Sequence, residues 1–109
     1  MGVSKRLKLD VIGYWSEIKL DIIRKYATAY SKVIANQTKP RLGHIYIDAF
    51  AGAGVHLSKV SGDAILGSPQ IAVNIDPPFL EYHFIDLDPS KTDNLRLLMA
   101  GKPNVHIYD

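Results

Sequence analysis

The chain has 109 residues, of which 47% are hydrophobic, so it is long enough for one domain and too apolar to be intrinsically disordered. It contains no cysteine, which excludes disulfides, thiolate metal sites and a cysteine nucleophile within these residues. No apolar run reaches membrane-spanning length, and no apolar core follows the basic N-terminal residues, so we expect a cytoplasmic protein.

Charge is distributed unevenly along the chain. Residues 1–41 contain nine Lys and Arg against three acids, a net charge of +6, whereas residues 42–109 contain four against eight, a net charge of −4. The basic half can be a solvated helix face with a basic arm, or a surface for nucleic acid or an acidic partner. Lys5, Arg6 and Lys8 have no aromatic residues interleaved among them, so support for nucleic acid is weak.

The first predicted element is a long helix. Ser16 can cap its N-terminus, and the helical spacing of apolar residues continues to about Asn36. Two adjacent apolar stripes predict a wide buried face, and Trp15 is expected to anchor the helix on the sheet. The stripes consist of Ile18, Leu20, Ile22, Ile23, Tyr26, Ala27, Ala29, Tyr30, Val33 and Ile34.

Strands and helices then alternate. Residues 44–50, 80–85 and 104–108 predict three strands, and the first is apolar on both sides, as in a buried parallel strand. This alternation predicts an α/β fold with a doubly wound parallel sheet, in which strand order 3-2-1 forms the first half of a Rossmann-like sheet, preceded by the long N-terminal helix.

Two short helices are expected between the strands. Each begins with a polar cap followed by proline at the first helical position, Ser68-Pro69 and Asp88-Pro89. In the second helix, Leu95, Leu98 and Met99 are expected to face inward.

Thirteen residues, 55–67, separate the first glycine turn from the next helix start. Ser61, Gly62 and Asp63 form a turn signal between two apolar runs, which predicts a small hairpin over the mouth of the site, as a lid or a partner surface. A passive surface loop is the alternative. His56 in this segment can orient a substrate or simply be solvated.

Ligands of such sheets bind at the carboxyl ends of the strands. Gly52 and Gly54 follow the first strand and allow the backbone to approach a ligand closely. Asp86 follows the second strand and can accept hydrogen bonds from both hydroxyls of a ribose. Together these residues predict a site for an adenosine-containing ligand.

The identity of that ligand can be narrowed. The dinucleotide fingerprint requires a small residue where this chain has Leu57, and it requires a helix N-terminus directly after the turn. The P-loop pattern also fails, because no glycine precedes Lys59. S-adenosylmethionine, which has a ribose and no phosphate, fits the remaining requirements.

Four stretches in order, "IGYWSEIKLDIIRKY", "YIDAFAGAG", "GSPQIAV" and "EYHFIDLDP", resemble the three-Cys-motif partner protein family. The second and fourth are also similar to the glycine motif and second-strand acid of class I S-adenosylmethionine-dependent methyltransferases. The resemblance covers roughly residues 11–109, and family members are typically several-fold longer. It therefore implies one incomplete methyltransferase-like domain, with the arm and helix in residues 1–41 and the cofactor-binding βαβαβ half in residues 42–109.

The resemblance also implies site residues and a partner. The partner is a separately encoded protein with three characteristic cysteines. Asp86 would bind the ribose and Leu87 would cover the adenine, while Asp48 would reach the cofactor's ammonium through water or, alternatively, cap the glycine turn. Asp88 is more simply a helix cap. The implied cofactor contacts are Asp48, Phe50, Gly52, Gly54, Asp86 and Leu87.

No catalytic residue is identified, and His44, His83 and His106 do not have the spacing of metal ligands. The alternatives are a non-catalytic cofactor-binding or assembly partner, a nucleic-acid methyltransferase fragment, and half of a nicotinamide-dependent dehydrogenase, which Leu57 disfavours. Because the first strand, His44–Phe50, would have no neighbour on one side, the isolated chain is expected to self-associate through that edge or to be only marginally folded, and to bind the cofactor poorly.

Overall fold

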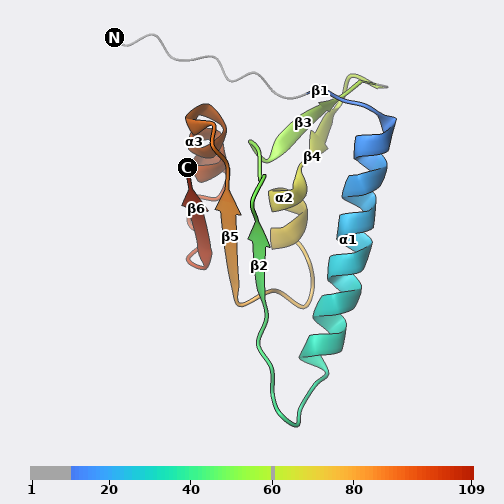
Figure 1. Ribbon diagram of the computed structural model, residues 1–109, viewed down its shortest axis with the longest axis vertical. Coiled ribbons are helices and arrows are strands. Elements are labelled where there is room, and N and C mark those ends of the chain that lie inside the picture. Colours follow the sequence, from blue (N-terminus) through green and yellow to red (C-terminus); the bar gives the residue numbers. More distant parts are fainter. Residues whose placement is uncertain (1–10, 60) are drawn as a thin grey trace.

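The computed structural model describes residues 11–59 and 61–109, so the predicted basic arm at Lys5, Arg6 and Lys8 lies outside the described residues. The described part is mixed α/β, with three helices and two small three-stranded sheets (Figure 1). None of these helices is long and apolar enough to cross a membrane. The elements in chain order are β1 (Val11–Ile12), α1 (Tyr14–Ala35), β2 (Ile45–Asp48), β3 (Val55–Ser58), β4 (Ala64–Leu66), α2 (Ser68–Val73), β5 (Glu81–Ile85), α3 (Pro89–Leu98) and β6 (Val105–Tyr108).

One sheet consists of β2, β5 and β6, which are all parallel and lie in that order. Their carboxyl ends therefore lie at one edge, at the top of Figure 1. Within the described residues, β2 pairs with β5 on one side only, so its other edge carries no ladder. Self-association through this edge stays a prediction.

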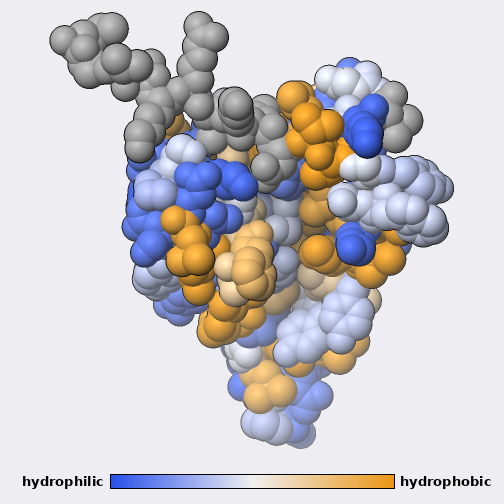
Figure 2. Space-filling view, turned by 45° about the horizontal axis from the view of Figure 1, so that its top comes forward, coloured by the Kyte–Doolittle hydropathy of each residue, from blue (hydrophilic) through white to orange (hydrophobic). Residues whose placement is uncertain are grey.

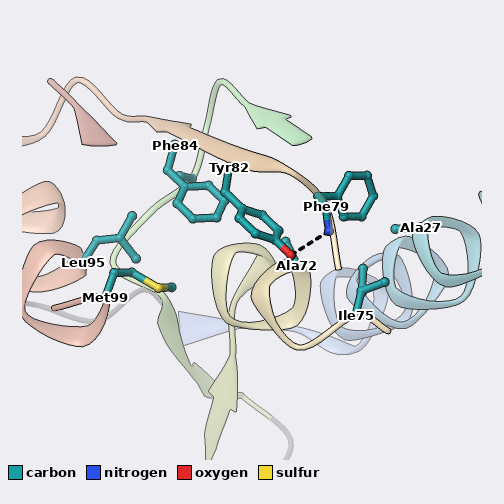
Figure 3. Close-up of a cluster of buried hydrophobic side chains, with 9 residues drawn as sticks. Ala27, Ala72, Ile75, Phe79, Tyr82, Phe84, Leu95 and Met99 are labelled. Atoms are coloured by element: carbon teal, nitrogen blue, oxygen red, sulfur yellow. Dashed lines mark hydrogen bonds between the residues drawn. The ribbon is translucent and has the colours of Figure 1, made fainter. Parts of the chain in front are cut away.

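The core lies between one face of this sheet and helices α2 and α3 (Figure 3). Tyr82 and Phe84 point from β5 into this space, and Leu95 points toward them from α3. The Tyr82 hydroxyl accepts a hydrogen bond from the backbone N–H of Phe79 at 3.0 Å, so neither buried polar group is left without a partner. The other buried members of the cluster are Ala27, Ala51, Ala72, Ile75 and Met99.

Helix α1 is much less buried than its apolar stripes predict. Only Ala27 and Ser31 are buried, and Tyr26 is 73% exposed. The buried strip of α1 is narrow and lies against α2 and the segments around His44 and Pro77. There the Ser31 hydroxyl is hydrogen-bonded to His44 Nε2 and donates to the Pro77 carbonyl. The remaining stripe residues are partly buried or exposed: Ile18, Leu20, Ile23 and Ile34 are partly buried, and Ile22, Tyr26, Ala29, Tyr30 and Val33 are exposed. The predicted wide buried face is therefore wrong for this chain.

Trp15 is 74% exposed, so its predicted role as an anchor on the sheet is also wrong. Trp15 lies in the first turn of α1. Within the described residues, the one aromatic ring in contact with it is that of neighbouring Tyr14, in an edge arrangement with the ring centroids 5.8 Å apart. The helix also begins before the predicted cap. Gly13 is its N-cap, and the backbone N–H of Ser16 already donates to the Gly13 carbonyl.

The two predicted caps in the second half differ in outcome. Asp88 caps α3, because its carboxylate accepts a hydrogen bond from the backbone N–H of Ser90 at 3.0 Å, and this prediction is confirmed. Ser68 does not cap α2. Gly67 occupies the N-cap, and the Ser68 hydroxyl donates to Asp48 instead, since that carboxylate lies within reach at the end of β2.

The predicted hairpin is present. β3 and β4 pair antiparallel, with His56 opposite Ile65, and Gly62 in the connecting turn has a φ of +74°, which glycine adopts without strain. β1 pairs parallel with β3 and completes a second sheet beside the N-terminus of α1. The segment is therefore a paired hairpin, and its role as a lid or a partner surface, against the passive alternative, stays a prediction.

Candidate functional site

The loops that follow β2 and β5 are joined at the carboxyl edge of the sheet. The backbone N–H of Gly52 donates to Asp86 Oδ2 at 3.0 Å, and the backbone N–H of Ala51 donates to the Ile85 carbonyl at 3.0 Å. The glycine turn and the second-strand acid, which are 34 residues apart in sequence, therefore form one local structure. This is the position at which parallel α/β sheets bind ligands.

Asp48 is engaged within the protein through both carboxylate oxygens. One accepts the backbone N–H of Phe50 at 3.0 Å, and the other accepts the hydroxyl of Ser68 at the start of α2. Asp48 thus holds the glycine turn against α2. This arrangement agrees with the second of the two roles expected for Asp48, a cap of the glycine turn. The sequence analysis missed Ser68 as its partner, because a serine before proline is typical of a helix cap.

Asp86 uses both carboxylate oxygens but has acceptor capacity left. Its Oδ2 accepts from Gly52, and its Oδ1 accepts the backbone N–H of Asp88 at 2.9 Å. An ionised carboxylate offers about four acceptor positions, so each oxygen can accept one further hydrogen bond. The residue is half-buried, and two additional donors from a ribose would complete its coordination.

Gly52 and Gly54 share a positive φ, +75° and +90°, but their surroundings differ. A Cβ at Gly52 would have only one neighbour within 4 Å, the His56 ring at 3.6 Å, whereas a Cβ at Gly54 would lie 2.9 Å from Leu98 and 3.1 Å from Leu95. Gly54 is therefore required for packing against α3. A Cβ at Gly52 would thus meet fewer neighbours than one at Gly54, although Gly52 itself is buried.

Helix α3 holds the turn through a second contact that the sequence analysis missed. The Asn94 side chain donates to the Ala53 carbonyl at 2.8 Å. Asn94 is one polar residue on a predicted helix, and nothing in its sequence context indicates that it faces the glycine turn.

The glycine turn and the start of α2 are separated by thirteen residues in the sequence but lie next to each other in the fold. The backbone N–H of Gly67 donates to the Gly54 carbonyl at 2.8 Å, and a Cβ at Gly67 would lie 3.2 Å from the Gly54 carbonyl carbon. The hairpin therefore leaves and returns at one point, and α2 starts beside the turn. The expectation that no helix start adjoins the turn is wrong, since the close approach needed there is supplied by Gly67.

The hairpin is fixed to the N-terminal part of the described chain. The Ser58 hydroxyl donates to Glu17 Oε2 at 2.8 Å, and the backbone N–H of Lys59 donates to the Ile12 carbonyl at 2.7 Å. The half-buried His56 ring lies against the glycine turn, with its Nε2 3.0 Å from where a Gly67 Cβ would stand. His56 is thus a neighbour of the turn rather than a freely solvated loop residue.

Two large apolar side chains flank this structure without cover. Phe50, two residues before Gly52, is 89% exposed, and Leu87, directly after Asp86, is 92% exposed. No other large hydrophobic residue in the described part of the chain is as exposed. Figure 2, in which the top of the molecule is turned forward, shows hydrophobic residues at several places on the surface of this face.

Two pKa shifts reflect the local contacts. The hydroxyl and backbone N–H of Ser90 stabilise the ionised form of Asp88 and lower the pKa of that carboxyl. Burial, aided by the negative charge of nearby Asp48, raises the pKa of Tyr46 to about 12. The ionised Asp88 carboxylate therefore serves as the cap of α3. Tyr46 is neutral at ordinary pH and packs against the core.

Comparison with known proteins adds no match: no family model fits the chain, and none of the curated proteins compared with it is significantly similar. The chemistry assigned to this edge of the sheet therefore rests on its own residues and on the sequence motifs.

Proposed function

We propose that this chain binds S-adenosylmethionine at the carboxyl edge of the β2-β5-β6 sheet, as the first half of a Rossmann-like, methyltransferase-like domain. The observation that carries the proposal is the hydrogen bond from Gly52 to Asp86, which joins a glycine turn to a second-strand acid. Phe50 and Leu87 stand uncovered on the two loops so joined.

Each part of the cofactor has a counterpart at this edge. The ribose hydroxyls donate to the two remaining acceptor positions of Asp86, one on each oxygen. Leu87 covers the adenine, since nothing in the described chain covers Leu87 itself. The methionine part lies along the backbone of Phe50 and Gly52. Asp48 orients the turn, because its oxygens are occupied by Phe50 and Ser68.

The proposed biological setting is an assembly with a three-Cys-motif protein, which the family resemblance implies. No residue is assigned to catalysis, so transfer of the methyl group is left outside the proposal. A non-catalytic assembly partner would use the same site. A nicotinamide dinucleotide is the competing ligand that must be tested directly, because α2 begins beside the turn.

The decisive experiment is calorimetric titration of the chain with S-adenosylmethionine, S-adenosylhomocysteine and NAD in parallel. We expect binding of the first two and none of NAD. Replacing Asp86→Asn should weaken binding by about 10–100-fold, since a hydrogen bond to a charged group contributes about 1.5–3 kcal/mol. Tighter binding of NAD would replace the proposed ligand.

Asp88→Asn is the matched control. It makes the same change in charge on the same loop, and asparagine caps a helix as well as aspartate does, so α3 should be unaffected. Affinity should remain within about threefold of the parent. Equal losses in both variants would show that net charge, and not the Asp86 contact, determines binding. Gly54 variants are unsuitable, because a side chain there meets α3 whether or not a ligand binds.

A further inference from the structure

The pairing of β5 with β6 brings two histidines together that are 23 residues apart in sequence. His83 and His106 are directly opposite in the parallel register, and their rings stack with centroids 4.9 Å apart and planes 16° from parallel. Spacing along the chain does not show this relation, because it depends on which residues of two separate strands are paired. The two rings lie on the face of the sheet opposite to the core.

Glu81 completes a cluster with the two histidines. It begins β5, two residues before His83, and therefore lies on the same face of the strand. Its Oε2 lies 3.3 Å from His83 Nε2, and its Oε1 lies 3.9 Å from His106 Nε2. One ligand atom from each of the three side chains can be chosen so that all lie within 4.8 Å of one another.

These separations are close to what a metal ion requires. Ligands about 2.1 Å from a tetrahedral zinc ion lie roughly 3.4 Å apart, which these distances approach. Binding also requires one of the two stacked rings to rotate, because the ion must lie near the plane of each imidazole. Two imidazoles with one carboxylate form a familiar ligand set for zinc and for iron(II). The side chains of Glu81 and His106 are 50% and 42% exposed, so an ion can reach them from solvent.

Tyr108 supplies the outer contact that such sites use. Its hydroxyl lies 2.9 Å from His83 Nδ1, and its ring stacks on His83 with planes 10° from parallel. When Nδ1–H donates to this hydroxyl, His83 Nε2 presents its lone pair toward Glu81. In the other tautomer, Nε2–H donates to Glu81 Oε2 and Nδ1 accepts the Tyr108 O–H, so the contacts are also satisfied without a metal. The Tyr108 contact is therefore compatible with metal binding, because it can hold the tautomer in which Nε2 coordinates the ion.

We propose that Glu81, His83 and His106 bind one divalent transition-metal ion, zinc in the first instance, on the open face of the β2-β5-β6 sheet. Three protein ligands leave one position of a tetrahedral ion for water or a further ligand. The site is separate from the proposed cofactor edge, because Glu81 begins β5 whereas Asp86 follows its end. The ion would clamp β5 to β6 on the face that lacks apolar packing.

The test is titration of the chelator-treated chain with Zn²⁺ in competition with a chromogenic chelator, together with Co²⁺ as a spectroscopic probe. The chain contains no cysteine, so no thiolate competes for the ion. We expect one saturable zinc ion per chain and cobalt absorption bands in the visible range that indicate nitrogen and oxygen ligands. Zinc should also raise the melting temperature, because it binds the folded state. Absence of saturable one-to-one binding would overturn the proposal.

The variants distinguish this site from nonspecific binding. His106→Gln and Glu81→Gln should each weaken zinc binding at least about tenfold and abolish the thermal shift, and Tyr108→Phe should weaken it by about 10–100-fold. Asp63→Asn, in the exposed hairpin turn, should bind as the parent does. Both Gln variants change half-exposed side chains, so they should still melt cooperatively in the absence of metal. Equal zinc affinity in His106→Gln and the parent would show that the ion binds elsewhere.

Discussion

The two faces of the β2-β5-β6 sheet are made by alternate residues of the same strands, yet they have opposite environments. On one face, Tyr82 and Phe84 are buried under α2 and α3. On the other face, Ile45 and Ile47 of β2 are largely exposed, and the titratable cluster of β5 and β6 lies beside them. Strand geometry fixes this alternation, since successive side chains point to opposite faces.

The difference separates stability from chemistry. Close packing on the covered face means that any loss of volume creates a cavity, whereas a side chain on the open face contacts water and few neighbours. The open face can therefore hold Glu81, His83 and His106, whose polar atoms would be costly to bury without partners. It also holds Ile47, which is 62% exposed within the described part of the chain. Substitutions of matched chemistry on the two faces test this division.

The largest effect is expected from Phe84→Ala. Phe84 is fully buried, and its ring packs against those of Tyr46 and Tyr82. Truncation removes the apolar contact and leaves a cavity, which costs about 3–5 kcal/mol for a buried phenylalanine. The free energy of unfolding of a small domain is about 5–15 kcal/mol, so the loss is a large fraction of it. Denaturant unfolding followed by circular dichroism would measure it.

Ile47→Ala is the control on the open face. Ile47 is 62% exposed, so its truncation should change the free energy of unfolding by less than about 1 kcal/mol. A loss comparable to that of Phe84→Ala would mean that a second copy of the chain or another protein covers this face. Light scattering at the same concentration would identify self-association as the cause.

Removing a tyrosine hydroxyl from each face is expected to have an intermediate effect on the covered face and a small effect on the open face. Tyr82→Phe leaves the buried backbone N–H of Phe79 without its acceptor, which should cost about 1–3 kcal/mol. Tyr108→Phe removes a hydroxyl from a tyrosine that is 46% exposed, where water can replace the contact with His83. In the absence of metal it should cost less than about 0.5 kcal/mol. Equal costs in chemical denaturation would contradict the division.

Local signals in the sequence predicted part of this structure. The three strands of the larger sheet and their parallel order follow from the apolar runs and the helices between them. Asp88 before Pro89 predicted a cap correctly, because the capping carboxylate and the Ser90 N–H that donates to it lie within three residues. The hairpin followed from the Ser61-Gly62-Asp63 turn signal.

The features that the sequence did not predict depend on tertiary contacts. The apolar stripes of α1 indicate a helix but not what covers it, and in this chain only Ala27 and Ser31 are buried. The Ser68 hydroxyl could cap a helix N-terminus or donate to Asp48, and only the tertiary fold brings Asp48 within hydrogen-bonding distance. Gly67 and Asn94 meet the glycine turn, and His83 meets His106, across separations that no local pattern encodes.

The smallest effect expected on the covered face concerns Tyr46 of β2, whose pKa is raised to about 12 by burial and by the charge of Asp48. Because the phenol ionises near pH 10 when unfolded, the neutral ring should contribute its full stability below about pH 10 and lose it as the pH rises toward 12. The full shift corresponds to about 3 kcal/mol, and partial exposure of the ring reduces the expected loss to about 1 kcal/mol. Tyr46→Phe lacks this ionisation, while the remaining tyrosines titrate in both proteins and cancel in the comparison. Denaturation midpoints of the parent and Tyr46→Phe should therefore converge or cross as the pH is raised through this interval. If the two midpoints fall in parallel, Tyr46 is as accessible as a residue of the open face, and the division between the two faces does not extend to β2.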